Sequence, residues 1–319
     1  MMKILKRVGK IMLIIIAFLA AALLVCYINH RVRLAEEAER FTAIGTLVNV
    51  NGHNMNVYTE GEGDVTVVFM SGGGTCSPVL DFRSLYSRLT EDHAIAVVEK
   101  IGYGFSDVAD IDRDIDSILS DTRAALAEAG VNAPYILCPH SMSGLEAIYW
   151  AQKYPEEVLG IVGLDMSVPG YYDDMKINIP LLRLATFGAG AGITRFIPGL
   201  SESDAIKYGT LTEEEKEIYR AVFYRRTATV TMINESEAVK ANAEKTAAGD
   251  FVQLPVLMFI SDGSGTGFEK DEWRRIAEEY ISHIPGGRYI ELDCPHYVHN
   301  YEYERIADEM KEFIELCEG

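Results

Sequence analysis

A serine stands where an apolar run ends and a helical pattern begins. The stretch "YILCPHSMSGLEAIYW", residues 135–150, predicts a buried strand, a short turn at Ser141 and an amphipathic helix. A tight strand–turn–helix connection holds such a serine in strained geometry, with its hydroxyl projecting above the sheet. The N–H of Met142, at the start of the helix, then faces a developing oxyanion. The pattern predicts that Ser141 acts as a nucleophile on an acyl carbonyl.

A glycine run follows another apolar strand. In "VVFMSGGGTCSP" the strand ends at Ser71, and Gly72, Gly73 and Gly74 come next. Because glycine has no Cβ, this run lets the backbone approach a substrate closely. A nucleotide-binding phosphate loop would end in G-K-[ST], and "GGGTCS" lacks that ending.

Both motifs lie in a chain of alternating strands and helices. From about Phe41 a hairpin around "NGHN" is followed by short apolar runs that alternate with amphipathic stretches. This order specifies an α/β fold, a mostly parallel sheet covered by helices on both faces. Ligands of such sheets bind at the carboxyl ends of the strands, where Ser141 lies. Strands are expected at "VTVVFM", "HAIAVVE", "PYILC", "LGIVGLDM", "PVLMFIS" and "RYIELDC", and "SPVLDFRSLYSRLTED" is expected to form one of the helices.

A segment of different character interrupts the alternation. Residues 168–250 are helical or loop-like without a clear strand, and they lie between two strands of the sheet. They predict an inserted helical lid. Its apolar side chains could line a pocket for an ester or form the lid's own core; they are Tyr171, Tyr172, Leu181, Leu182, Phe187, Phe196, Phe223 and Tyr224.

The first 40 residues predict a membrane anchor. Four basic residues precede an uncharged apolar span of eighteen residues, 11–28. At 1.5 Å per residue this span reaches about 27 Å, close to the hydrocarbon thickness of a bilayer. A cleaved signal peptide would have a shorter apolar core and an A-x-A-like site, which does not follow Val25. The basic excess before the span predicts a single-pass protein with residues 41–319 outside the cytoplasm.

Charge and cysteine spacing argue against other classes of protein. The chain has 48 acidic and 29 basic residues and a net charge of −19, so it repels phosphate backbones and no nucleic-acid partner is expected. The five cysteines show neither a C-x-x-C spacing nor a zinc pattern, so we expect buried thiols and neither a metal nor a cofactor. They are Cys26, Cys76, Cys138, Cys294 and Cys317.

The turn at Ser141 resembles a known motif. "PHSMSG" is similar to the nucleophile elbow of the α/β-hydrolase superfamily, commonly G-H-S-M-G-G, with Pro139 and Ser143 in place of two glycines. The resemblance extends over about Phe41 to Gly319, and "EKIGYGFSD" resembles the family's D-x-x-G-x-G-x-S turn. It implies an α/β-hydrolase domain over residues 41–319, with an eight-stranded, mostly parallel sheet, preceded here by one transmembrane helix.

The same resemblance implies further site residues. Ser71 stands where the family usually has the His of a His-Gly loop, and by position the N–H of Gly73 joins that of Met142 in an oxyanion hole. His296, just beyond the last strand in "ELDCPHYVHN", matches the general base. His299 is then structural, and His140 is a neighbour of the nucleophile. A metal bound by His296 and His299 would lack a third ligand.

The resemblance leaves two candidates for the triad acid. In the commonest family layout the acid comes about nine residues after the proline of "PVLMFIS", but that count from Pro255 reaches Ser264, and Asp262 comes two residues early. In a second layout the acid follows the preceding strand, where Asp165 lies in "VGLDMSVP". The missing carboxylate at Ser264 favours Asp165, with Asp262 as the alternative.

The expected activity is hydrolysis of a carboxylic ester or a related acyl bond. Ser141 would form an acyl-enzyme with His296 as general base, and water would cleave it. The expected partners are a small-molecule acyl substrate and the membrane. Two alternatives stay open: a hydrolase-fold module that binds a ligand without turnover, and an acyltransferase that passes the acyl group to an alcohol.

Overall fold

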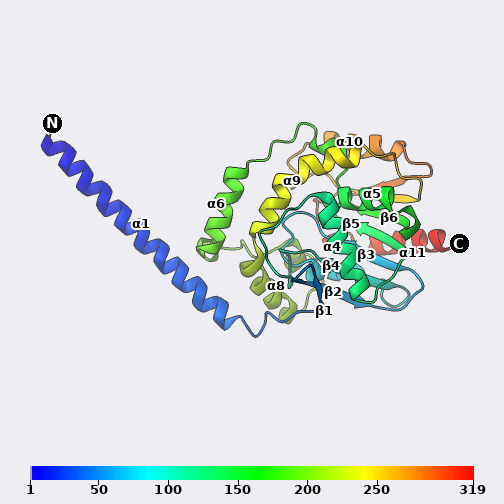
Figure 1. The fold of residues 1–319 in the computed structure, drawn as a ribbon, viewed down its shortest axis with the longest axis horizontal. Helices are drawn as coiled ribbons and strands as arrows, with labels where there is room; N and C mark the ends of the chain where they lie inside the picture. Colours follow the sequence, from blue (N-terminus) through cyan, green and yellow to red (C-terminus); the bar gives the residue numbers. More distant parts are fainter. Residues whose placement is uncertain (1) are drawn as a thin grey trace.

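One eight-stranded sheet organises the protein, in the order β1-β2-β4-β3-β5-β6-β7-β8 (Figure 1). The computed structural model describes residues 2–319. The pairs β1–β2 and β2–β4 are antiparallel, and every other pair is parallel. The predicted mostly parallel, eight-stranded α/β fold is therefore confirmed. The strands are β1 (Thr46–Val50), β2 (His53–Glu60), β3 (Thr66–Met70), β4 (Ala94–Glu99), β5 (Tyr135–Pro139), β6 (Val158–Leu164), β7 (Val256–Ile260) and β8 (Arg288–Glu291).

Helices cover both faces of this sheet. Successive residues of a strand point to opposite faces, so Val68 of β3 packs in one core cluster and Val67 in the other. The first cluster includes residues of α4 (Ile115–Glu128), α5 (Ser143–Lys153) and α10 (Lys270–Ser282). The second includes residues of α2 (Pro78–Asp81), α3 (Arg83–Tyr86) and α11 (Tyr303–Glu318).

Two local predictions have different outcomes. The "NG" turn joins β1 to β2 as expected, with Asn51 and Gly52 at φ 52° and 88°, the left-handed conformation that these two residues tolerate. The single helix expected at "SPVLDFRSLYSRLTED" is wrong, because the structure has two short helices there, α2 and α3. Phe82 lies between them, and its ring packs 5.3 Å from Phe69 and 4.7 Å from His299.

The segment between β6 and β7 is helical, as predicted. It contains η2 (Pro169–Tyr172), α6 (Ile179–Gly190), η3 (Ile193–Phe196), α7 (Asp204–Lys207), α8 (Glu213–Arg226) and α9 (Val230–Ala247). We call residues 168–250 the insertion. Tyr171 and Tyr172 are buried, but Leu181, Phe187 and Phe196 are exposed. These three exposed side chains therefore form neither the core of the insertion nor the lining of a closed pocket, contrary to both expectations.

Helix α1 (Met2–Glu36) projects from the body, and its free end lies far from the C-terminus (Figure 1). It is long and apolar enough to cross a membrane: its best 18-residue window has a mean hydropathy of 3.1, and none of that window is buried. A signal sequence meets the same criterion. The last turns of α1 contact η3 and α8.

Strand β4 ends in a buried carboxyl group. Glu99 Oε2 accepts hydrogen bonds from the Phe105 N–H at 2.7 Å and from Asn56 Nδ2 at 3.0 Å, and Oε1 accepts one from the Val79 N–H at 3.3 Å. A Cβ on Gly104 would lie 2.0 Å from the carboxyl carbon of Glu99, so the turn requires glycine there. Burial raises the pKa of Glu99 to about 7.

We expect Glu99 to lower the stability of the protein as the pH rises from about 4.5 to about 7. The folded state keeps the Glu99 proton over this range and the unfolded state loses it, so folding loses up to about 3 kcal/mol from this group. Melting temperatures of the detergent-solubilised chain, measured from pH 5 to pH 8, check this. In Glu99→Gln the decline should shrink, although the overall stability falls, because an amide cannot accept from Val79 and Phe105 at once. An unchanged decline in the variant would contradict the assignment.

Candidate active site

Ser141 occupies a strained turn between β5 and α5. Its φ of 55° is left-handed, a conformation that costs a residue with a Cβ about 1–2 kcal/mol. Its carbonyl oxygen accepts the N–H groups of Gly144 at 2.9 Å and of Ser167, which follows β6, at 2.7 Å. A Cβ on Gly72 would lie 2.6 Å from Ser141 Cβ, so the glycine run after β3 packs directly against the turn. The predicted strand–turn–helix at Ser141 is therefore present.

Ser143, where the family commonly has glycine, ties this turn to β3. Its hydroxyl lies 2.7 Å from the carbonyl oxygen of Met70 and 2.8 Å from that of His140. It also accepts the His140 N–H at 3.0 Å. Ser143 is fully buried, so these bonds are shielded from water. This role was not predicted, because a small residue at this position suggests only the absence of a clash.

We expect Ser143→Ala to destabilise the protein by about 1–3 kcal/mol, the cost of removing one partner from a buried polar group. Because the Ser141 hydroxyl is unchanged, the folded variant should keep most of its catalytic activity. Thermal unfolding of the two proteins side by side measures the change. A variant as stable as the wild type would show that the Ser143 hydroxyl contributes nothing to the turn.

His296 and Asp165 are directly hydrogen-bonded. His296 Nδ1 lies 2.5 Å from Asp165 Oδ2, although the two residues are 131 positions apart in the sequence. Asp165 is 2 % exposed and follows β6, with a left-handed φ of 47°. Its other oxygen, Oδ1, accepts the Trp273 Nε1–H at 2.8 Å and the Ser261 N–H at 2.7 Å. These two donors fix the carboxylate, so Oδ2 is oriented toward His296.

Asp262, the alternative acid, is engaged elsewhere. Its Oδ1 accepts the N–H of Ser264 at 2.8 Å, within its own turn. Its backbone N–H donates to the carbonyl oxygen of Cys294. The structure therefore brings Asp165, and not Asp262, into hydrogen bonding with His296.

His140, the residue before Ser141, packs against His296. The His140 ring, next to Ser141 in the chain, lies 4.7 Å from the His296 ring, centroid to centroid. Its Nε2 lies 3.2 Å from the His296 carbonyl oxygen. Within residues 2–319 no hydrogen bond joins Ser141 Oγ to His296. Catalytic hydrogen bonds are often long in enzymes without substrate and tighten when it binds.

The residues of the two predicted oxyanion donors are in contact through the Met142 side chain. A Cβ on Gly73 would lie 2.9 Å from the side-chain methyl of Met142, so the glycine run reaches the start of α5. Among residues 2–319 neither the N–H of Gly73 nor that of Met142 has a hydrogen-bond acceptor. Unpaired backbone donors beside a nucleophile are what stabilisation of a tetrahedral intermediate requires.

Comparison with known proteins gives a close relative and the type of fold. The uncharacterized protein YbdG of Bacillus subtilis (strain 168) is 36% identical over 320 residues, which cover 97% of this chain and 98% of YbdG. Among solved structures, the ancestral haloalkane dehalogenase AncHLD2 superposes with a TM-score of 0.65 at 21% identity, over 86% of this chain and 99% of its own. This chain belongs to one family with YbdG, and its fold is that of the α/β-hydrolases. No protein-family model matches it.

A second solved structure of the superfamily is an esterase. The thermophilic esterase from Thermogutta terrifontis superposes with a TM-score of 0.61 at 16% identity, over 85% of this chain and 97% of its own. Both structural neighbours are hydrolases by name, an esterase and a dehalogenase. At these identities the likeness shows the α/β-hydrolase fold, and the chemistry has to be argued from the site.

Two further histidines, His299 and His140, pack next to each other beside His296. His299, fully buried, has Nε2 2.8 Å from Asp81 Oδ2, and its ring lies 4.8 Å from that of His140. Burial, followed by the nearby His296 and His299, lowers the pKa of His140 well below the ordinary value. His140 is therefore neutral at physiological pH, and it packs against the His296 backbone without adding charge to the site.

Two features next to this site were not predicted from the sequence. Nothing in the sequence near Trp273 shows that its indole N–H reaches Asp165. Lys100, in the "EKIGYGFSD" turn, is buried and pairs with Glu146 of α5 at 2.7 Å and with Glu235 of α9. Burial alone would lower the pKa of Lys100, but Glu146 and Glu235 outweigh it and raise that pKa. The charged group thus joins the helix after Ser141 to the insertion.

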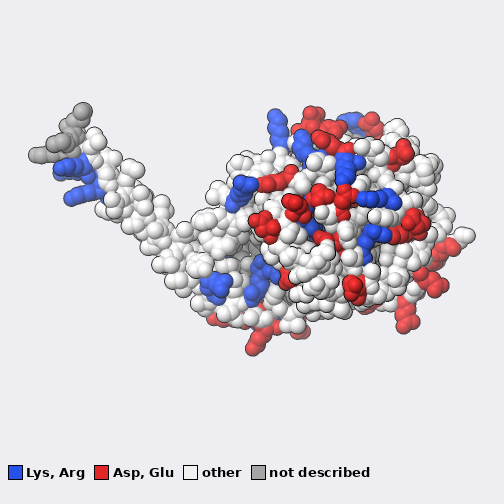
Figure 2. Space-filling view, in the orientation of Figure 1, with Lys and Arg blue, Asp and Glu red and all other residues white. Residues whose placement is uncertain are grey.

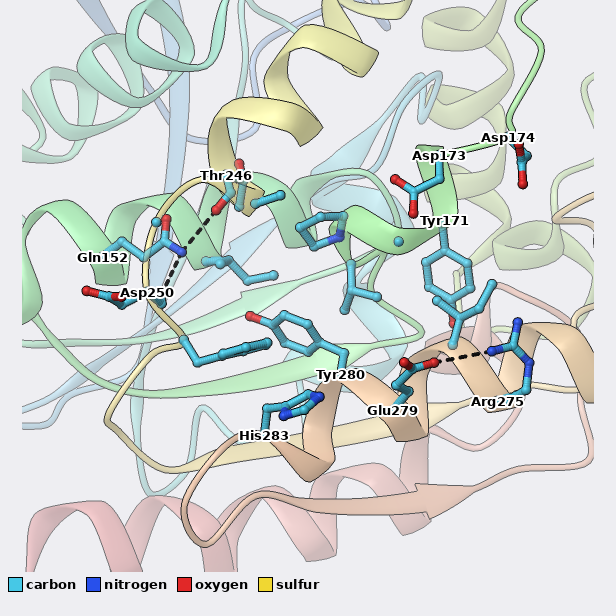
Figure 3. Close-up of a pocket in the computed structure, with 18 of the residues that line it drawn as sticks. Gln152, Tyr171, Asp173, Asp174, Thr246, Asp250, Arg275, Glu279, Tyr280 and His283 are labelled. Atoms are coloured by element: carbon cyan, nitrogen blue, oxygen red, sulfur yellow. Dashed lines mark hydrogen bonds and ion pairs between the residues drawn. The ribbon is translucent and has the colours of Figure 1, made fainter.

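A hollow between four elements lies away from Ser141 (Figure 3). It has a volume of about 410 Å³ and lies between α5, η2, the end of α9 and α10, with Tyr171, Tyr280 and His283 among its lining residues. Ser141, His296 and Asp165 do not line it. Tyr171 stacks on Trp273 with ring centroids 3.9 Å apart, so its ring lies between this hollow and the partner of Asp165. In the described part of the chain, no group of three metal-ligating side chains is present.

Proposed function

We propose that this α/β-hydrolase is a serine hydrolase that cleaves a carboxylic ester or a related acyl bond. One observation carries the proposal: the buried Asp165 carboxylate orients His296, whose ring packs on that of His140, the residue before Ser141 in its strained turn. Nucleophile, base and orienting acid come from the ends of β5, β8 and β6, in the roles of a Ser-His-Asp triad. The hydrolytic structural neighbours support the reaction class.

Each residue has a defined step in the proposed mechanism. Ser141 Oγ attacks the acyl carbonyl carbon while His296 Nε2 takes the hydroxyl proton, and Asp165 accepts the His296 Nδ1–H. The N–H groups of Gly73 and Met142 hold the oxyanion. The intermediate collapses to an acyl-enzyme when the leaving alcohol takes the proton back from His296. Water, deprotonated by His296, then releases the carboxylic acid and restores Ser141.

The two alternatives differ from this proposal in defined ways. A module that only binds ligands needs neither a strained serine nor a carboxylate that fixes a histidine tautomer, and both are present. An acyltransferase would use the same acyl-enzyme and pass the acyl group to an alcohol in place of water. We favour hydrolysis because it needs no second substrate and because the structural neighbours are hydrolases by name.

We also propose that α1 stays attached as a membrane anchor, with residues 41–319 outside the cytoplasm. Basic side chains at its free end are followed by a stretch without charge (Figure 2). The end of the apolar span packs on the body, since a Cβ on Gly192 would lie 2.8 Å from the Cys26 carbonyl oxygen, and cleavage after the span would remove Cys26 from this contact. The test is a fusion, after Gly319, of a reporter that functions only in the cytoplasm. Activity of this fusion would overturn the topology.

Covalent labelling tests the proposed activity. A fluorophosphonate probe should label the folded wild-type chain, and peptide mass spectrometry should place the label on Ser141. Hydrolysis of a panel of esters of graded chain length then defines the acyl preference. A folded wild type that takes no label and hydrolyses no ester would favour the binding module.

A further inference from the structure

The insertion exposes large apolar side chains on α6 and on the segment after it. On α6, Leu181, Leu184 and Phe187 recur every three residues, so they lie along one side of the helix, with exposed fractions of 58%, 62% and 55%. Three more apolar side chains that follow α6 in the chain are exposed as well. We call the whole set the apolar face: Leu181, Leu184, Phe187, Phe196, Ile197 and Leu200, all exposed. The other side of α6 packs on α9, so the body leaves this face uncovered.

Contacts to α1 fix the position of the apolar face. Arg195 of η3 donates two hydrogen bonds to the Glu37 carboxylate, at 2.8 and 2.7 Å, and a third to His30 Nδ1 at 2.9 Å. Gly192 packs so closely on α1 that a Cβ there would lie 2.3 Å from His30 Cβ and 2.8 Å from the Cys26 carbonyl oxygen. The segment after α6 is therefore attached to α1.

The attachment lies at the end of the apolar span. Cys26 is within residues 11–28, and His30 follows two residues after that span. Two residues of helix correspond to about 3 Å, less than the depth of the headgroup layer on one side of a bilayer. When residues 11–28 cross the membrane, η3 and the end of α6 therefore lie at the level of the headgroups. Figure 1 shows α6 on the side of the body that faces the free part of α1.

Charge at the same junction suits a phospholipid surface. A hollow of about 330 Å³ is lined by His30 and Leu34 of α1, by Gly190 of α6, and by Arg225 and Arg226 of α8. Within residues 2–319 neither arginine forms an ion pair: Arg226 Nε donates to the Gly104 carbonyl oxygen at 2.8 Å, and Arg225 donates to that of Leu34. Lys and Arg atoms are visible where α1 meets the body (Figure 2). In a chain with a net charge of −19, two cations without carboxylate partners match anionic headgroups.

We propose that the apolar face rests on the bilayer that α1 crosses, with the exposed side of α6 at the boundary between headgroups and acyl chains. The occupant is phospholipid, and Arg225 and Arg226 lie at the level of its phosphates. The proposal depends on the anchored topology proposed above and is independent of catalysis. It explains why the face is apolar and uncovered, since half-immersed helices bury this kind of side in the interface.

Tryptophan quenching by brominated lipid tests this placement. The full chain carrying Phe187→Trp is reconstituted in phosphatidylcholine–phosphatidylglycerol vesicles with brominated acyl chains, and its emission is compared with that in unbrominated vesicles. The native Trp150 and Trp273 are 0% and 3% exposed and give a constant background. Leu316→Trp is the matched control, because Leu316 is 64% exposed near the C-terminus, far from α1.

We expect bromine to reduce the added Phe187→Trp emission about twofold or more and to leave the Leu316→Trp emission unchanged. Equal quenching of the two variants would overturn the proposal. A blue-shifted Phe187→Trp emission without bromine quenching would overturn it as well, in favour of a second copy or another protein. Flotation of the vesicles tests the anchor separately, and a chain that does not float contradicts both anchor and docking. The Ser141→Ala background should give the same quenching, so loss of catalysis cannot be mistaken for loss of docking.

Discussion

Ser141→Ala is expected to lower kcat for ester hydrolysis by at least about 10⁴-fold, as losing the nucleophile of a triad does elsewhere. Alanine keeps the Cβ of serine, so the strain at φ 55° and the packing against Gly72 are unchanged. Ser141 Oγ has no hydrogen-bond partner within residues 2–319, so its removal leaves no buried group unsatisfied. The melting temperature should therefore stay within a few degrees of the wild type.

The measurement compares kcat/KM of the two proteins for a soluble short-chain ester, together with fluorophosphonate labelling. Any residual rate would come from the oxyanion donors and substrate binding alone. Ser143→Ala is the matched control, since it removes a hydroxyl two residues away, weakens the turn and leaves the nucleophile in place. Retention by Ser141→Ala of a tenth or so of the activity would show that another residue carries the chemistry.

Asp165→Asn is expected to lower kcat by about 10⁴-fold with little change in KM. The amide oxygen can keep the two bonds that Oδ1 receives from Trp273 and Ser261, so the side chain stays where it is. Its NH₂ then replaces Oδ2, 2.5 Å from His296 Nδ1. Because a donor now faces that nitrogen, neutral His296 carries its proton on Nε2. It can then no longer take the proton of Ser141.

Asp262→Asn is the matched control for this prediction. The Asp262 carboxylate accepts the Ser264 N–H at 2.8 Å, and an amide oxygen can accept the same bond. We expect kcat to change by less than about threefold, since no hydrogen bond joins Asp262 to His296 in the described chain. Near-normal turnover by Asp165→Asn together with a large loss in Asp262→Asn would reverse the assignment of the acid.

The sequence alone predicted the features that depend on neighbours in the chain. The "NG" turn, the eight-stranded α/β sheet and the turn at Ser141 follow from local conformational preference and from periods of two or 3.6 residues. The apolar run of residues 11–28 identified a helix that can span a membrane. These patterns depend on residues that are close together in the chain, so they can be recognised without knowledge of tertiary contacts.

Tertiary structure decided which side chains meet. Asp165 and Asp262 follow neighbouring strands, and only the docking of α10, which brings Trp273 to Oδ1, orients one of them toward His296. The apolar residues of α6 pointed to a pocket or a core, but its packing on α9 leaves Leu181 and Phe187 exposed. These outcomes depend on contacts between residues far apart in the chain, and a single sequence does not record such contacts.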